Sequence, residues 1–294
     1  MSLELCILGS GSTGNCSVLR TPAGAALIDA GLGPRIVARR LDGTGVSVRD
    51  VRAICLTHLD SDHFSVTWVN AILNRDIRVF CHGQRMNDLV SVVAKYGEDV
   101  DESRVEAFRK QTVPFGRKEV ALLDGVTFQA IPLAHDATGS HGFIIRGHGC
   151  SIGFATDLGH VPDELIARFA ADGLNVLALE SNYDPQMQLT SPRPFFLKQR
   201  IMGGRGHLSN EQAFAAIRAI LDRCERSFRK LPEHIVLLHR SRQCNCPEIV
   251  RRMFTQDARV AQRLTLAEPY TRSEWLRPRE VQPARGEQLT LSFG

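Results

Sequence analysis

His58-Leu59-Asp60-Ser61-Asp62-His63 packs two imidazoles and two carboxylates into one short segment. The segment follows the apolar run 53–56, and an apolar run of this length that stops at a polar cluster is typical of a buried strand ending in a loop. Such side chains at a strand end are the kind of ligands that hold divalent metal ions. The alternative is a solvated turn with two unrelated histidines, so a metal site requires further ligands elsewhere.

Other histidines and aspartates follow predicted strands in the same way. These pairs are the strand 126–131 with His135, the strand 151–155 with Asp157 and the strand 235–238 with His239. Each residue alone fits an ordinary turn or a helix cap. Together with the four ligands of the first segment they form a set sufficient for two adjacent cations at one edge of a core.

The remaining periodicity predicts a mixed α/β protein. Strands dominate the first half and recur among helices later, which favours sheets sandwiched between helices. A capping box formed by Ser209 and Gln212 opens an amphipathic helix that extends to about Arg226. Further strands are expected at 3–8, 16–19, 25–28, 78–81, 120–123, 142–146 and 176–179, and further helices at 34–41, 66–73, 84–104, 163–171 and from Pro247.

In addition to the candidate ligands, a glycine-rich segment and Asp29 are relevant to the predicted metal site. The glycine-rich segment 9–15 joins two predicted strands, so it meets neither the Rossmann nor the P-loop context. It can line a pocket with N–H groups and hydroxyls that bind an anion, or it can be a simple tight hairpin. Asp29 ends a strand just before a glycine, where its carboxylate is placed to orient a metal ligand.

The composition is that of a globular protein without a membrane segment. The chain of 294 residues is 43% hydrophobic and 23% charged, and its net charge of +4 permits a polyanionic partner without requiring one. The eight cysteines form no C-x-x-C pair, and several lie in apolar runs, so no disulfide framework is expected. No basic leader or transmembrane-length apolar stretch is present, which predicts a cytoplasmic protein.

The order of these motifs resembles the metallo-β-lactamase fold over about residues 1–270. The resemblance is closer to the YycJ/WalJ-like branch of that superfamily. The segments that carry it are Gly9 to Cys16, Glu180 to Asn182, Gly206 to Asn210, and His239 with Asn245, Pro247 and Glu248. The resemblance implies a four-layer αββα sandwich and metal-dependent phosphodiester hydrolysis, with 5′-to-3′ exonuclease action on DNA.

The resemblance also implies roles for individual residues. One divalent metal ion takes His58, Asp60, His135 and Asp157; the other takes Asp62, His63, Asp157 and His239. Asp62, His207 and Asn182 are the implied catalytic residues, the last two by contact with the scissile phosphate, although the segment of His207 also caps a helix. A second phosphate is expected at Ser10, Ser12, Thr13 and Asn15.

Position 60 departs from the superfamily, most of which has His-x-His-x-Asp-His where this chain has His-x-Asp-x-Asp-His. A carboxylate is harder than imidazole and favours manganese or iron relative to zinc, or it leaves the first site weak. Two metal ions are expected, with zinc, manganese and iron as candidates. The short separation between Asp157 and His239 leaves no room for the inserted domain of the β-CASP nucleases.

The composition changes near the carboxyl end, which predicts a catalytic domain over 1–274 and a flexible tail over 275–294. The tail contains Gln288-Leu289-Thr290-Leu291-Ser292-Phe293, which resembles the peptide with which bacterial repair proteins bind the sliding clamp. A tether ending in Gln288 and the alternating apolar residues Leu289, Leu291 and Phe293 suits docking into a groove. The alternative is an edge strand folded back on its own domain.

Three hypotheses for function follow from the sequence. The first is a dinuclear metal-dependent DNA exonuclease acting in replication or repair. The second is a small-molecule hydrolase, because this fold also cleaves lactams, lactones, thioesters and cyclic phosphodiesters. The third is a metal-binding scaffold in which Asp60 marks a decayed site. Phosphate-sized contacts and a basic groove favour the first hypothesis, and metal content separates the third from the others.

Overall fold

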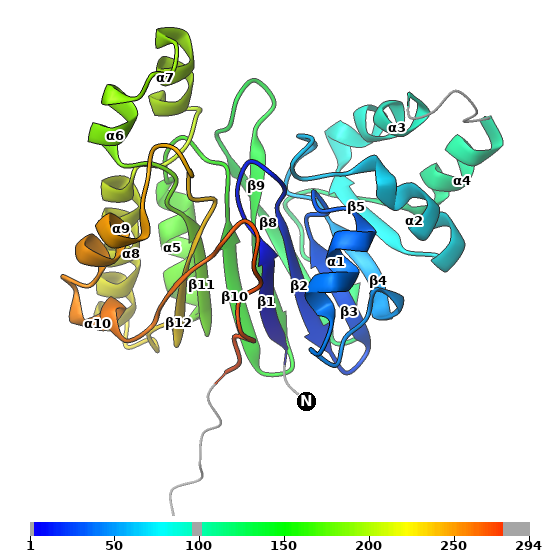
Figure 1. The fold of residues 1–294 in the computed structure, drawn as a ribbon. Coiled ribbons are helices and arrows are strands. Elements are labelled where there is room, and N and C mark those ends of the chain that lie inside the picture. The colour runs from blue at the N-terminus through cyan, green and yellow to red at the C-terminus, as the bar shows by residue number, and fades with distance from the viewer. Residues whose placement is uncertain (1–2, 96–101, 279–294) are drawn as a thin grey trace, which may run out of the picture.

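The computed structural model describes residues 3–95 and 102–278. Within these ranges two β-sheets pack face to face, and helices cover the outer face of each sheet (Figure 1). The αββα sandwich predicted from the sequence is therefore confirmed. Over the same ranges, no helix combines the length and the apolar character needed to cross a membrane.

The first sheet comes from the amino-terminal part of the chain. Strands β1 to β3 form an antiparallel meander, and β4 to β6 continue the sheet in parallel from β3. Helices α1 to α4 lie on its outer side (Figure 1). The bounds are β1 Glu4–Gly9, β2 Cys16–Thr21, β3 Gly24–Ile28, β4 Val51–Cys55, β5 Arg78–His82, β6 Thr112–Phe115, α1 Pro34–Leu41, α2 Val69–Arg75, α3 Met86–Ala94 and α4 Glu102–Gln111.

The second sheet follows in sequence. Strands β7 to β10 are antiparallel, and β10 to β13 are parallel. Helices α5, α8, α9 and α10 lie on its outer side, and α6 and α7 project beyond them (Figure 1). The bounds are β7 Val120–Leu123, β8 Val126–Leu133, β9 Ser140–Gly147, β10 Cys150–Ala155, β11 Val176–Glu180, β12 His234–Leu238, β13 Leu264–Leu266, α5 Asp163–Asp172, α6 Pro185–Thr190, α7 Phe195–Met202, α8 Asn210–Arg226, α9 Pro247–Phe254 and α10 Ala258–Ala261.

The alternation of side chains along each strand divides the core into three layers. Leu5 and Ile7 of β1 lie in the core between the sheets, whereas Cys6 and Leu8 pack on the side of the helices. Because successive side chains of a strand point to opposite faces, a strand that is apolar at every position must be buried on both faces. Burial of both faces of these strands explains the continuous apolar runs in the sequence.

Four phenylalanines hold the two sheets together. Phe80 and Phe115 come from the first sheet, and Phe128 and Phe143 come from the second. Their rings meet edge to face across the interface, with centroids 5.4 Å apart for Phe115 and Phe128 and 5.6 Å apart for Phe80 and Phe128. Each such pair adds about 0.5–1.5 kcal/mol to the free energy gained by burial.

The single helix predicted over 84–104 is wrong. The structure has α3 ending at Ala94 and a separate α4 beginning at Glu102. The two helices bury different contacts, since α3 packs through Leu89 and Val93 and α4 packs through Phe108. The broad polar pattern of the sequence segment concealed the end of α3 at Ala94.

The packed part of the chain continues past the predicted boundary at residue 274. Leu276 exchanges two backbone hydrogen bonds with Leu5 of β1, at 2.8 and 3.1 Å, and its side chain is buried in the core between the sheets. The Arg277 guanidinium lies 3.3 Å from the Glu4 carboxylate. Residues 275–277 therefore belong to the packed domain. The predicted clamp peptide, Gln288 to Phe293, lies outside the described residues.

Candidate metal centre

The ligands predicted from the sequence meet at one edge of the two sheets. His58 follows β4, His135 follows β8, Asp157 follows β10 and His239 follows β12. The His58 ring centroid lies 4.0 Å from that of His63 and 5.1 Å from that of His135. The carboxyl ends of parallel strands are a common location for binding sites, because the loops that follow them converge there.

The backbone turns sharply where strands β3, β10 and β12 end. Asp29, Asp157 and His239 have φ of 58°, 53° and 52°, in the left-handed region that non-glycine residues rarely occupy. Such a conformation persists only where the surroundings hold it in place. The His239 N–H donates to Ser10 Oγ at 2.8 Å and the Asp29 N–H donates to Cys55 O at 2.9 Å. The turned backbone directs these side chains off the sheet and into the site.

The predicted ligands form two groups in which the donor atoms lie within 4.8 Å of one another. One group is His58, His135 and Asp157, and the other is Asp62, His63 and His239. Asp157 lies between them, since its Oδ2 is 3.0 Å from His63 Nε2 of the second group and its Oδ1 is 3.9 Å from His135 Nε2 of the first. Asp60 stands at the rim of the first group, with Oδ2 3.7 Å from His58 Nε2 and its side chain 45% exposed.

Each of the four histidines has Nδ1 within reach of an oxygen acceptor. The contacts are His58 to Thr57 Oγ1 at 3.0 Å, His63 to Asp29 Oδ2 at 2.7 Å, His135 to Gly206 O at 3.0 Å and His239 to Glu180 Oε1 at 3.3 Å. Because carboxylate and carbonyl oxygens can only accept, Nδ1 carries the proton. Thr57 gives its own hydroxyl proton to Asp29, so it too accepts from His58. In each ring Nε2 is then the nitrogen that a metal ion can take.

Two buried nitrogens support this interpretation. His58 Nε2 and His239 Nε2 have no hydrogen-bond partner within the described part of the chain. A buried polar atom left unpaired costs about 1–3 kcal/mol, so such atoms call for a ligand. The donor set of imidazole nitrogens and carboxylate oxygens is suited to divalent metals. The residues at this site are therefore suited to the divalent metal ions that the fold implies.

The carboxylates impose strong electrostatic effects on these rings. Burial lowers the pKa of His239, but Asp157, Asp62 and Glu180 outweigh this effect and raise it to about 10. Burial raises the pKa of Asp62, but the neighbouring His239 and His63 lower it to about 2. In the same way His239 and His63 hold the pKa of Asp157 well below its usual range. A field that draws protons to these nitrogens also favours a metal cation.

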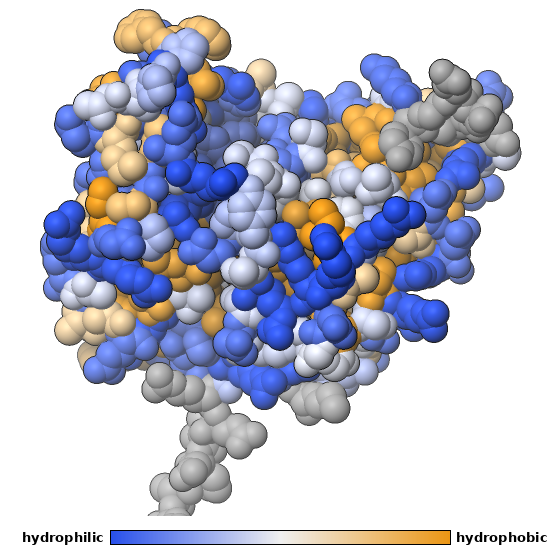
Figure 2. Space-filling model, in the orientation of Figure 1, coloured by the Kyte–Doolittle hydropathy of each residue, from blue (hydrophilic) through white to orange (hydrophobic). Residues whose placement is uncertain are grey.

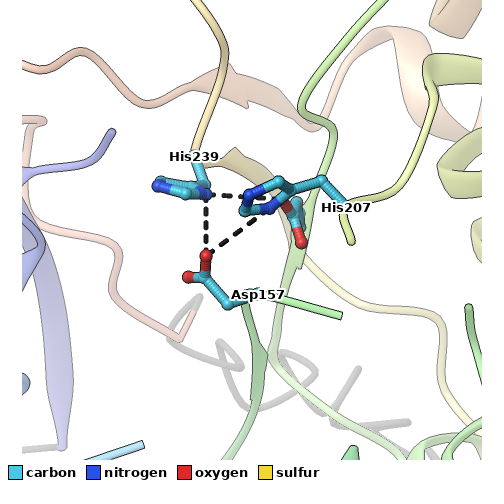
Figure 3. A group of neighbouring side chains, drawn as sticks. Asp157, His207 and His239 are labelled. Carbon is cyan, nitrogen blue, oxygen red and sulfur yellow. Dashed lines mark hydrogen bonds and ion pairs between the residues drawn. The ribbon is translucent and has the colours of Figure 1, made fainter. Parts of the chain in front are cut away.

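His207 and Glu180 adjoin the two groups. Glu180 is fully buried, and its Oε1 accepts from His207 Nδ1 at 2.6 Å while its Oε2 accepts from the Leu158 N–H at 2.9 Å. Asp157, His207 and His239 converge from three different segments (Figure 3). Burial lowers the pKa of His207, but the Glu180 carboxylate raises it overall. No role was predicted for Glu180 from the sequence, although Glu180 follows a predicted strand just as the ligands do.

The other predicted residues occupy different positions. Ser10 and Asn15 are buried, and Asn15 Nδ2 donates to Asp62 Oδ2 at 3.2 Å, so both residues hold the site together. Ser12 lines the cavity over the ligands, and Thr13 beside it is exposed. Asn182 is buried, and its amide donates to the His239 carbonyl at 2.7 Å. In the described contacts, Asn182 supports His239.

A cavity of about 210 Å³ opens above the ligands. Asp62, Asp157, His207 and His239 form part of its lining on the ligand side, and Leu197, Arg200 and Ile201 line it from helix α7. The Arg200 guanidinium makes an ion pair with Asp136, the residue directly after His135. One wall of the site is therefore supplied by a helix that carries no ligand.

An αββα sandwich with histidine and aspartate ligands at the sheet edge defines the class of metal-dependent hydrolases. Residues 26–235 match the model of the beta-lactamase superfamily domain, and the chain belongs to that superfamily, with the metallo-β-lactamase fold. The metallo-β-lactamase fold protein YhfI from Bacillus subtilis has a similar structure, with a TM-score of 0.63 at 11% identity over 93% of this chain and 100% of that one.

Two curated relatives are exodeoxyribonucleases by name. The chain is 26% identical to exodeoxyribonuclease YycJ of Bacillus anthracis, over 87% of this chain and 89% of the relative. It is 29% identical to exodeoxyribonuclease WalJ of Streptococcus pneumoniae, over 83% of each. The predicted resemblance to this branch of the superfamily is confirmed.

Proposed function

We propose that this protein is a dinuclear metal-dependent phosphodiesterase that degrades DNA from its 5′ end during replication or repair. The observation that carries the proposal is the convergence of two ligand groups about Asp157, beside a cavity that His135, Asp157 and His239 help to line. The names of the relatives supply the substrate class, and the direction of cleavage rests on the resemblance of the motifs.

In this proposal the first metal ion takes His58, His135 and Asp157 with Asp60 at the rim, and the second takes Asp62, His63, Asp157 and His239. Zinc, manganese and iron all suit such ligands, and the carboxylate of Asp60 favours the harder two. When bound, two such cations lower the pKa of a water and stabilise the attacking and leaving oxygens.

The protein's own side chains supply the remaining chemistry. Asp62 is ionised at neutral pH and is held by Asn15, so its carboxylate can accept a hydrogen bond from the attacking water. Glu180 raises the pKa of His207, which favours the protonated ring, and His207 lines the cavity. We assign to His207 the proton that the departing ester oxygen takes up. Glu180 then holds the ring in the orientation needed for this transfer.

End-labelled DNA tests the proposed function directly. With added manganese or zinc, the wild-type protein is expected to release mononucleotides from a strand labelled at its 5′ end before it shortens the 3′ label. The Asp62→Ala variant, assayed alongside, should lack this activity because the ligand and the water contact are both lost. Hydrolysis of lactones or thioesters without any DNA cleavage would assign the site to small molecules and refute the proposal.

A second element of the proposal concerns the sliding clamp. We propose that Gln288, Leu289, Leu291 and Phe293 dock into the clamp and so deliver the nuclease to replicating DNA. Deletion of residues 288–293 is expected to abolish pull-down of purified clamp while leaving nuclease activity on free DNA unchanged. A protein in which Ser292 alone is changed to alanine serves as the control, since position 292 lies between the apolar positions. Undiminished pull-down after the deletion refutes clamp binding.

A further inference from the structure

Helix α7 exposes an unusual number of apolar side chains. Its sequence is Phe-Phe-Leu-Lys-Gln-Arg-Ile-Met, and all eight residues are described, yet none of them is buried. Phe195 and Phe196 are 73% and 71% exposed, and Leu189 of the neighbouring α6 is 56% exposed. The space-filling view shows an apolar surface at the end of these two helices, at its upper left (Figure 2). Isolated exposed apolar residues are common, but adjacent exposed aromatics point to a binding surface.

The exposed helices are held firmly against the domain. We name residues 185–202 the α6–α7 arm. Asp184 caps α6 by accepting from the Met187 N–H at 2.8 Å. Arg193, between the two helices, donates to Gln188 Oε1 at 3.1 Å and to Gln243 Oε1 at 2.9 Å. The two phenylalanines are therefore presented on a fixed support, which reduces the entropy lost when a ligand binds.

The same arm borders the metal centre. Leu197, Arg200 and Ile201 of α7 line the cavity above the ligands. A second cavity, of about 570 Å³, includes Arg200, Arg205 and His160 in its lining. Helix α7 therefore carries both the exposed rings and Arg200, and Arg205 lines the same second cavity next to the proposed cleavage site. A DNA strand bound at the metal centre would therefore pass next to this arm.

We propose that Phe195 and Phe196 form a stacking surface for unpaired bases of single-stranded DNA whose terminal phosphodiester lies at the metal centre. The proposal rests on the proposed function and extends it to strand preference. Aromatic rings stack on any base, and arginines beside them attract the phosphate backbone, so the combination binds single strands without regard to sequence. Bases must be unpaired to stack, so a single-stranded end is preferred over a blunt duplex.

A second copy of this chain fits the surface less well. A stable protein interface buries about 800 Å² on each partner. Each phenylalanine can contribute about 150–250 Å², so these two rings with Leu189 supply about half of that area. Arg200 on the same helix and Arg205 in the second cavity also suit a polyanion better than an identical basic chain.

The double variant Phe195→Ala, Phe196→Ala tests this proposal. Its KM for a single-stranded oligonucleotide is expected to rise roughly 5- to 100-fold, as expected for the loss of base stacking. Hydrolysis of bis(p-nitrophenyl) phosphate, which has no bases to stack, should be unchanged, as should metal content. An oligonucleotide with abasic terminal positions should give the same KM with the wild type and the variant.

Phe228 provides a matched control. It is 98% exposed and lies just beyond the carboxyl end of α8, whose amino end follows His207. A helix of 17 residues separates the two ends by roughly 25 Å. Phe228→Ala should therefore leave the KM for the oligonucleotide unchanged.

Several results would overturn the stacking surface. They are an equal rise in KM for the abasic oligonucleotide, an equal effect of Phe228→Ala, or no effect of the double variant on an active wild-type nuclease. Sedimentation that shows a wild-type dimer and a monomeric double variant with unaltered KM assigns the surface to a second copy. A wild-type protein that cleaves no phosphodiester at all refutes the proposed function instead, so the two failures are distinguishable.

Discussion

The Asp157→Asn variant is expected to bind metal poorly at both ligand groups and to lose about 1000-fold in phosphodiester hydrolysis. Asp157 is 2% exposed, and its two oxygens face His63 of one group at 3.0 Å and His135 of the other group at 3.9 Å. Loss of one charge from a buried ionic cluster costs about 3–5 kcal/mol, and each 1.4 kcal/mol is about tenfold. Because this carboxylate lies between both groups, one substitution acts on the whole site.

Metal content after reconstitution, and the rate on DNA, measure this effect. Asparagine keeps the shape of the side chain and tolerates the φ of 53° at this position, so the fold should persist. Asp76→Asn is the matched control, because Asp76 has φ of 52° at the end of α2 but lies far from the ligands in the fold. Two equivalents of metal and an undiminished rate in Asp157→Asn would contradict a shared ligand.

The ligands could be predicted from the sequence because each follows an apolar strand. His58, Asp157 and His239 all come after strands that run in parallel with a neighbour, and parallel strands bring their carboxyl ends to the same edge. The continuous apolar runs likewise predicted sheets buried on both faces. The local sequence pattern and the geometry of parallel sheets were sufficient to predict the ligands and the fold class, and the fold class is confirmed.

Contacts between distant segments could not be predicted in this way. Ser10 supports the His239 backbone across 229 positions of the chain, and Glu180 joins His207 to His239. The first contact depends on how the two sheets stack, and the second on how the segment before α8 meets the ends of β11 and β12; no periodicity encodes either. Helix α7 was missed for a related reason, because it buries no residue and so lacks the apolar stripe by which helices are recognised.

The His207→Ala variant should reduce the rate of DNA cleavage about 100- to 10,000-fold while metal content stays unchanged. His207 lines the cavity, Glu180 holds its ring at 2.6 Å and raises its pKa, and a positioned acid contributes a factor of this size. The alkoxide that leaves DNA needs a proton, whereas p-nitrophenolate does not. Hydrolysis of bis(p-nitrophenyl) phosphate should therefore fall much less, and the ratio of the two rates measures proton donation.

The Glu180→Gln variant separates proton donation from simple structural support. Glu180 raises the pKa of His207, so its loss should move the alkaline limb of the pH–rate profile on DNA to lower pH. The limb moves to lower pH because a histidine without its carboxylate partner loses its proton at lower pH. Glu180 also contacts His239, so metal content must be measured in the same protein. His234→Ala is the control, because His234 lies at the start of β12, contacts Arg277 O through Nε2 and contacts no proposed ligand in the described hydrogen bonds. Equal losses on DNA and on the p-nitrophenyl ester in His207→Ala, with no shift of the limb in Glu180→Gln, would show that His207 only binds the phosphate.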